Sequence, residues 1–220
     1  MTRLDRAVIV MAKRPLPGAT KTRMMPTLSA DKAAALYEVL LLDTIDMLVA
    51  RDDCTVLIAV DEPESADYFT TVAPELGQVG QGSGPLGDRL DRALTETLGS
   101  GFSHVFAINS DGPDLPPGHL DVAFAALGTA ETDLVFGPNV DGGYYLIGWK
   151  TPWPQVVTEV TMSTPTVLAD TLRIADTLGA SVTLAPEWFD VDVPDDLTRL
   201  AESLAGSTTR TAMFLKAMGT

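Results

Sequence analysis

Six short apolar runs recur along the chain with the length and composition of β-strands. They cover residues 7–12, 54–60, 104–109, 133–138, 144–149 and 181–186. Most are apolar at consecutive positions, which is typical of strands that are buried on both faces of a largely parallel sheet. The pattern therefore predicts a central sheet with helices on both sides.

Segments with helical periodicity separate these strands. They cover residues 30–50, 87–98, 117–127, 164–178 and 194–205. Ser29 is expected to cap the first helix, and the helix at 164–178 is expected to begin with Ser163 or Thr164 as its cap and Pro165 in its first turn. Alternating strands and helices predict a single α/β domain over residues 1–220, a three-layer sandwich with a mostly parallel central sheet.

Composition and charge restrict the classes of function. The chain has 220 residues, 45% of them hydrophobic, and a net charge of −15, which argues against a nucleic-acid or anionic-membrane partner. Cys54 is the single cysteine, and no apolar stretch reaches the roughly 18 residues of a membrane span. We therefore expect a cytoplasmic protein. Residues 207–218 are read either as a helix packed on the body or as a dimer contact, which leaves monomer and homodimer open.

Positive charge is concentrated near the N-terminus. Residues 1–32 hold seven Lys and Arg against two acids, whereas the remaining residues hold eight against twenty-eight. Four of the seven, Lys13, Arg14, Lys21 and Arg23, lie in residues 13–23, which we call the basic loop.

The basic loop has the composition of a phosphate site. Gly18 and two prolines pre-shape its backbone for close approach to an anion, and Lys and Arg bind phosphate oxygens. The loop also follows the first strand, and ligands of open α/β sheets bind beyond the carboxyl ends of the strands. We predict a polyphosphate site, with a solvated charged loop as the structural alternative.

Carboxylates lie in two later segments of the chain, one after the strand at 104–109 and one at residues 189–193. Asp111 comes just past a buried strand, and Asp190 and Asp192 occupy alternate positions of an extended segment, which places both side chains on one face. Mg²⁺ prefers one or two carboxylates together with phosphate oxygens. Asp111 is therefore the predicted Mg²⁺ ligand, with Mn²⁺ as an alternative ion, and the pair of Asp190 and Asp192 needs a cation or a hydrogen-bond donor between its like charges. Asp195 and Asp196 are better explained by the positive end of the helix that they begin.

Two glycine motifs do not fit familiar nucleotide sites. The sequence GATKT is no Walker A loop, because Thr20 stands where a glycine must precede Lys21. The sequence GSGPLG, residues 82–87, fits G-x-G-x-x-G, yet it lies mid-chain and contains Pro85. A loop leading into a helix is favoured over a dinucleotide site.

A third glycine motif lies between two apolar runs. Asp141, Gly142 and Gly143 are typical of a tight hairpin. Two glycines also allow a backbone to approach a ligand, so these three residues are candidates for the acceptor side of the pocket.

The order of the motifs carries a family resemblance. They are KRPLPGATKTR, PLGDRL, NSDGPDL, NVDGGYYLIG, MSTPTVL and FDVDVPDDL. Together they resemble the DUF2064 family of GT-A-like transferases, which is related to the guanylyltransferase that activates phospholactate or phosphoenolpyruvate. The resemblance covers about residues 7–200 and implies a GT-A (nucleotide-diphospho-sugar transferase) fold, a nucleotide donor and Mg²⁺.

The resemblance also assigns roles by position. Lys13, Lys21 and Arg23 would hold phosphates and Asp111 the metal, while the Asp190 and Asp192 pair would serve a second metal or the acceptor. The chain departs from the family pattern at position 85, where similar proteins often have an acid. Arg89 remains available to a phosphate.

Three functions are compatible with these features. The leading one is nucleotidyl transfer from a nucleoside triphosphate to a small phosphorylated or acidic acceptor, with the basic loop, Lys21 and Arg23 included, on the β- and γ-phosphates and Asp111 holding Mg²⁺ at the α-phosphate. The alternatives are glycosyl transfer from a nucleotide sugar and non-catalytic nucleotide binding by a regulator. Because fold does not settle function, the three stay open at this level.

Overall fold

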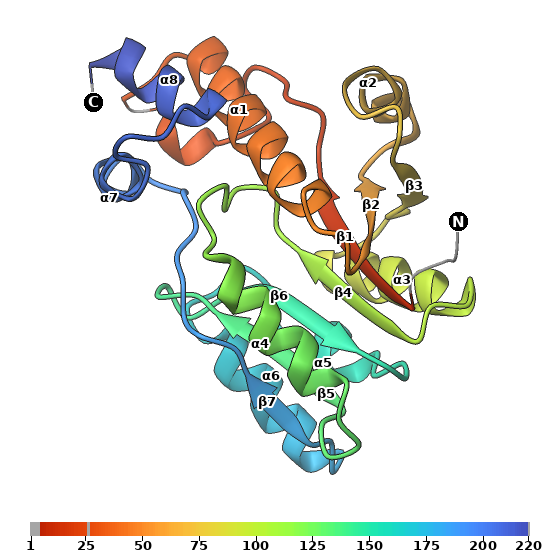
Figure 1. Ribbon diagram of the computed structural model, residues 1–220. Coiled ribbons are helices and arrows are strands. Elements are labelled where there is room, and N and C mark those ends of the chain that lie inside the picture. The colour runs from red at the N-terminus through yellow and green to blue at the C-terminus, as the bar shows by residue number, and fades with distance from the viewer. Residues whose placement is uncertain (1–4, 26, 220) are drawn as a thin grey trace.

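A twisted seven-stranded sheet forms the centre of the computed structural model, which describes residues 5–25 and 27–219 (Figure 1). The strand order is β3-β2-β1-β4-β6-β5-β7, and β6 runs antiparallel to both of its neighbours. The strands are β1 (Arg6–Ala12), β2 (Thr55–Val60), β3 (Gly77–Gly80), β4 (His104–Ile108), β5 (Leu134–Pro138), β6 (Tyr144–Trp149) and β7 (Val182–Leu184). The predicted α/β sandwich is confirmed.

Helices cover both faces of the sheet. They are α1 (Ala30–Val49), α2 (Ala66–Val72), α3 (Leu86–Gly99), α4 (Pro117–Leu127), α5 (Gln155–Thr158), α6 (Val167–Thr177), α7 (Asp196–Ser203) and α8 (Arg210–Met218), with short 3₁₀ turns η1 (Thr22–Met24) and η2 (Pro63–Ser65). One apolar cluster joins the sheet to α1, α2 and α4, and a second joins its other face to α3, α5 and α6.

Strand β1 shows why its sequence is apolar throughout. Val8 and Val10 pack in the first cluster, whereas Ala7 and Ile9 pack in the second. A central strand with helices on both faces has no solvent-facing position, so alternation disappears.

A third apolar cluster holds the C-terminal helices and the ends of two loops on α1. It joins Leu36 and Leu40 of α1 to α7 and α8, and it includes Met24 and Phe189. Figure 1 shows α8 beside α1 and α7 next to α8, both away from the sheet. The C-terminal segment is therefore a helix packed on the body. In the described part of the chain, no helix has both the length and the apolar character needed to cross a bilayer.

One strand and two helices were not predicted: β3, α2 and the four-residue α5. Strand β3 is an edge strand of sequence GQVG with no fully buried residue, and α2 is seven residues long and buries chiefly Phe69. Neither carries the continuous apolar pattern on which a prediction from sequence depends.

The predicted start of the helix at 164–178 is wrong. Ser163 adopts a left-handed conformation with φ 62°, and α6 begins at Val167 after a turn through Pro165. Leu168 N donates to Gly142 O at 3.1 Å, so the first turn of α6 is docked on the β5–β6 hairpin rather than extended by Pro165.

Helix α7 also starts later than predicted. It begins at Asp196, whose Oδ2 accepts hydrogen bonds from the backbone N of Asp192 and of Val193, each at 2.8 Å. Asp196 therefore fixes the segment before the helix.

Asp43 ties α8 to α1. Its buried carboxylate accepts from Thr211 N at 2.7 Å, from Arg210 N at 3.3 Å and from Arg210 Nη1 at 3.2 Å. We expect Asp43→Ala to lower the free energy of unfolding by about 2 kcal/mol, because it leaves the backbone amides of the first turn of α8 without their acceptor and removes one of the two carboxylates that pair with Arg210. Urea denaturation monitored by circular dichroism measures this loss.

The matched control is Asp46→Ala. Asp46 is exposed and pairs with the same Arg210, so its removal is expected to cost less than about 1 kcal/mol. Equal losses for the two variants would contradict this account of how α8 is held.

Candidate functional site

The basic loop follows β1 and turns back on itself. Ala19 N and Thr20 N both donate to Leu16 O, and Lys21 adopts a left-handed conformation with φ 48° before η1 begins. Left-handed backbone is costly for a residue with a side chain, and it persists where surrounding contacts impose it. The buried side chain of Met24 anchors the end of the loop against α1.

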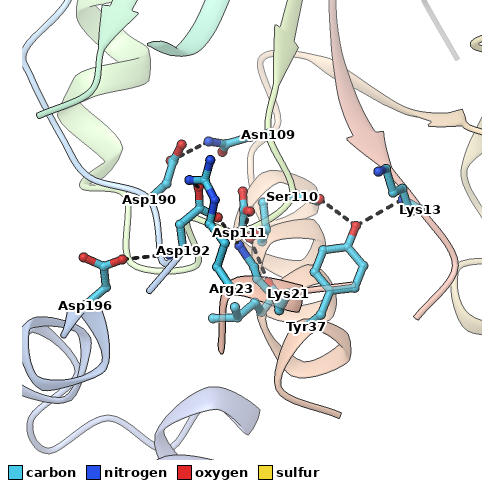
Figure 2. A network of polar contacts seen from close by, with 12 residues as sticks. Lys13, Lys21, Arg23, Tyr37, Asn109, Ser110, Asp111, Asp190, Asp192 and Asp196 are labelled. Atoms are coloured by element: carbon cyan, nitrogen blue, oxygen red, sulfur yellow. Dashed lines mark hydrogen bonds and ion pairs between the residues drawn. The ribbon is translucent and has the colours of Figure 1, made fainter. Parts of the chain in front are cut away.

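Lys21 connects two of the predicted carboxylates. Its Nζ donates to Asp111 Oδ2 and, at 2.9 Å, to Asp192 Oδ1 (Figure 2). Only 4% of the Lys21 side chain is exposed. Burial alone would lower the pKa of Lys21, but the charges of Asp111 and Asp192 outweigh it and raise this pKa above its usual value. The amine is therefore a fixed cation between two acids.

Lys21 and Arg23 approach Asp192 together. Arg23 Nη1 lies 3.6 Å from Asp192 Oδ2, and its side chain is largely exposed. Burial would raise the pKa of Asp192. The charge of Lys21 and its hydrogen bond lower this pKa by more, so that it falls below its usual value. Asp192 is consequently an ionised carboxylate that contacts both cations.

Asp190 has a different environment. Its carboxylate accepts hydrogen bonds from the side-chain amides of Asn109 and Asn139. Burial and the nearby charge of Asp111 raise the pKa of Asp190 well above its usual value. Asn109 follows β4 and Asn139 follows β5, so the ends of two strands hold this third acid.

The side chain of Tyr37 links the ends of strands β1 and β4. Its hydroxyl lies 2.8 Å from Ser110 Oγ and accepts from Lys13 N at 3.1 Å (Figure 2). Burial raises the pKa of Tyr37 to about 12, so the phenol stays neutral. Through this group α1 sets the spacing between the basic loop and the loop that carries Asp111.

A cavity of about 700 Å³ lies over these residues at the carboxyl edge of the sheet, and we call it the central cavity. Its lining includes Lys13, Arg23, Asp111, Asp141, Gly143, Asp190 and Asp192. A smaller recess of about 360 Å³ beside it is lined by Lys21, Thr22 and Asp111, among others. Predicted residues from four separate segments of the sequence thus line one cavity.

A second cavity of about 800 Å³ lies at the ends of β2 and β3, and we call it the side cavity. Lys13 lines both the side cavity and the central cavity. Asp61 and Arg89 also line the side cavity, and Arg89 Nη1 donates to Gln81 Oε1 at 2.9 Å. The GSGPLG loop forms part of its rim and leads into α3, as predicted.

Three predicted residues lie outside these cavities. Arg14 and Gly18 are exposed and line none of the three, and a Cβ on Gly18 would meet nothing within 4 Å. The glycine at position 18 is therefore explained by its left-handed backbone conformation, φ 79°, and not by a close approach of the backbone to another group. Gly142 packs against the backbone of Pro165, while its neighbours Asp141 and Gly143 line the central cavity.

Sequence reasoning missed four residues of the site: Tyr37, Asn109, Asn139 and Asp196. The two asparagines had a positional signal, because each directly follows a buried strand at the functional edge. Tyr37 and Asp196 had none, since each looks like an ordinary helix residue in the sequence.

The oxygen donors suit Mg²⁺ by their chemistry. Asp111, Asp190 and Asp192 line the central cavity, and the buried Oδ1 of Asn139 has no hydrogen-bond partner. Over residues 5–25 and 27–219, no three His, Cys, Asp or Glu side chains form a group that could hold a metal ion by itself. Mg²⁺ needs only one or two carboxylates when phosphate oxygens complete its shell, so these residues fit an ion that arrives with a nucleotide.

Lys21 occupies the space between two candidate metal ligands, and this generates a prediction. Lys21→Met should bind Mn²⁺ at least about tenfold more tightly than the native protein in the absence of nucleotide, because Asp111 and Asp192 then lack their cation. Titration monitored by the Mn²⁺ electron paramagnetic resonance signal gives both affinities.

Arg23→Met is the control for that titration. It removes an exposed cation at 3.6 Å and should change Mn²⁺ affinity by less than about threefold. Equal Mn²⁺ affinities for the native protein and Lys21→Met would show that Lys21 does not compete for the carboxylates.

The family comparison confirms the resemblance to the DUF2064 family over the middle of the chain. The model of the DUF2064 family, described as uncharacterized proteins conserved in bacteria, matches residues 44–164. A comparison with curated proteins found no match to the sequence.

Solved structures share the fold. A candidate nucleotide-diphospho-sugar transferase from Desulfovibrio desulfuricans G20 superposes with a TM-score of 0.89 at 27% identity, covering 97% of this chain and 95% of that one. A 4-diphosphocytidyl-2C-methyl-D-erythritol synthase gives a TM-score of 0.60 at 12% identity, with 93% and 99% covered.

A third structure contains a nucleotide. The CMP:2-keto-3-deoxy-manno-octonic acid synthetase complexed with CTP gives a TM-score of 0.55 at 11% identity, with 91% of this chain and 98% of that chain covered. At these identities the last two structures establish the fold alone: this chain has the nucleotide-diphospho-sugar transferase fold.

Proposed function

We propose that this chain, which belongs to the DUF2064 family, is a Mg²⁺-dependent nucleotidyltransferase that moves a nucleoside monophosphate group from a nucleoside triphosphate to a small phosphorylated or acidic acceptor. One observation carries the proposal. Three cations of the basic loop, Lys13, Lys21 and Arg23, line the same recess as Asp111 and Asp192, although the sequence separates these groups widely.

The two large cavities supply room for both halves of a nucleotide. The side cavity would take the base and ribose, and Lys13, which lines both cavities, would meet the phosphates where they pass into the central cavity. Lys21 and Arg23 would bind the β- and γ-phosphates. Asp111, with Asp192 and Asp190, would hold Mg²⁺, which when bound neutralises charge on the triphosphate.

The chemical step needs little from the protein beyond position and charge. An oxygen of the acceptor's phosphate attacks the α-phosphorus, a new P–O bond forms, and the bond from the α-phosphorus to the bridging oxygen breaks. Pyrophosphate leaves with the bonding electrons. Because the attacking oxygen is already an anion, no proton is transferred, and Lys21 and Arg23 stabilise the charge that builds on the leaving group.

Glycosyl transfer is the second candidate, and the similar Desulfovibrio protein favours it by its description as a candidate nucleotide-diphospho-sugar transferase. The same cations would then stabilise a departing nucleoside diphosphate.

Incubation with each nucleoside triphosphate, with nucleotide sugars and with a panel of phosphate acceptors separates nucleotidyl transfer from glycosyl transfer. We expect pyrophosphate; nucleoside diphosphate alone would overturn the proposal. Mg²⁺-dependent nucleotide binding without any product would favour the non-catalytic regulator.

Asp111→Asn tests the site itself. It should lower kcat by on the order of 100-fold and weaken the dependence of nucleotide binding on Mg²⁺, because the amide cannot supply an anionic ligand. Steady-state pyrophosphate release and calorimetric titration with and without Mg²⁺ measure the two effects.

Asp114→Asn is the matched control in the same loop. Asp114 bonds to Trp188 Nε1 at 3.4 Å and does not line the central cavity, so its change should leave kcat within about threefold. Similar losses of activity in the two variants would point to damage of the loop rather than to a role for Asp111.

A further inference from the structure

We propose that the acceptor is a phosphate ester of an uncharged, partly apolar alcohol, with no negative charge beyond the attacking phosphate. This inference rests on the proposed nucleotidyl transfer. It concerns the part of the central cavity that the nucleotide leaves free, which is bounded by residues 141–144 and 162–167 and is called the acceptor wall below.

The acceptor wall is one packed surface. Gly142 O accepts from Leu168 N at 3.1 Å, and a Cβ added to Gly142 would lie 1.9 Å from Pro165 O. The hairpin and the segment before α6 are therefore pressed together. The amide of Leu168 is used inside the protein, so it is not a free donor for a second anion.

The charges around the central cavity are divided unequally. Lys13 and Arg23, the cations among the described residues that line the central cavity, both belong to the basic loop, where the triphosphate would be bound. Asp111 and Asp192 already face Lys21. Within the described residues, the acceptor wall lines the central cavity with one charged side chain, Asp141, and with no cation.

Asp141 would repel an anionic acceptor body. Its side chain is exposed, and its Oδ1 accepts from Gly143 N at 2.9 Å, which fixes the carboxylate at the turn of the hairpin. A second carboxylate or phosphate on the acceptor would approach this charge with no compensating cation on the wall.

The rest of the acceptor wall combines apolar and neutral polar side chains, which are Tyr144, Met162, Pro165 and Val167 with Ser163 and Thr164. Leu86, Leu90 and Ile147 add apolar surface to the same cavity. The Tyr144 hydroxyl donates to Met162 Sδ at 3.7 Å, and burial raises the pKa of Tyr144, so the ring presents a neutral group. Such a surface gains free energy by covering an apolar body and loses it by desolvating a charged one.

Two matched probes test the inference: phenyl phosphate and 4-carboxyphenyl phosphate, which differ by one carboxylate. Each is titrated calorimetrically into the protein with Mg²⁺ and an α,β-methylene nucleoside triphosphate. We expect phenyl phosphate to bind at least about tenfold more tightly.

Asp141→Asn should reduce that preference to below about threefold. The amide oxygen can still accept from Gly143 N, so the hairpin keeps its turn while the charge is removed. Asp176→Asn is the matched control, because Asp176 is an exposed acid near the end of α6 that lines none of the cavities, and it should leave the preference unchanged.

Equal or tighter binding of 4-carboxyphenyl phosphate to the native protein would overturn the inference, as would an unchanged preference in Asp141→Asn. The probes are also titrated without the nucleotide analogue. If the nucleotide analogue does not bind in the presence of Mg²⁺, the proposed function fails. The preference for phenyl phosphate over 4-carboxyphenyl phosphate can then still be measured in the titrations without the analogue. Absence of phenyl phosphate binding under both conditions would overturn the acceptor class itself.

Discussion

The buried amine of Lys21, held between Asp111 and Asp192, is the interaction on which the site depends. It joins the loop after β1 to the loop after β4 and to the segment before α7. Two carboxylates that close would repel each other without a cation between them, and a buried amine without a partner would be costly. Each group therefore offsets the cost of burying the others, and the contacts hold the three segments together.

The fold brings these segments together by two devices. The parallel strands β1, β4 and β5 end at one edge of the sheet, which places the basic loop, Asp111 and Asn139 side by side. The apolar cluster beneath α7 and α8 then fixes the other partners: Met24 anchors the loop that carries Lys21, and Phe189 and Val191 alternate with Asp190 and Asp192. Packing on α1 thus determines where the charges stand.

Much of this arrangement could be predicted from sequence, for physical reasons that also mark the limits. Strands buried on both faces leave a continuous apolar signal, and a local excess of cations in an acidic chain is visible without a structure. What could not be predicted depends on tertiary contacts. Gly142 has the signature of a glycine at a ligand, yet Pro165 is its neighbour; Ser163 and Pro165 have the signature of a helix start, yet docking on the hairpin delays α6 to Val167. Tyr37 looks like a core residue of α1 until its hydroxyl is seen between Lys13 and Ser110.

Under the proposed function, the position of Lys21 means that binding of a metal-bound nucleotide would rearrange the site. Phosphate oxygens would replace Asp111 and Asp192 as the hydrogen-bond acceptors of the Lys21 amine, and the two carboxylates would then be available to the metal. A crystal structure with Mg²⁺ and an α,β-methylene nucleoside triphosphate tests this directly. The account predicts Lys21 Nζ within hydrogen-bond distance of a phosphate oxygen and Asp111 in direct contact with the metal. Phosphates bound elsewhere, with Lys21 still between the two carboxylates, would contradict it.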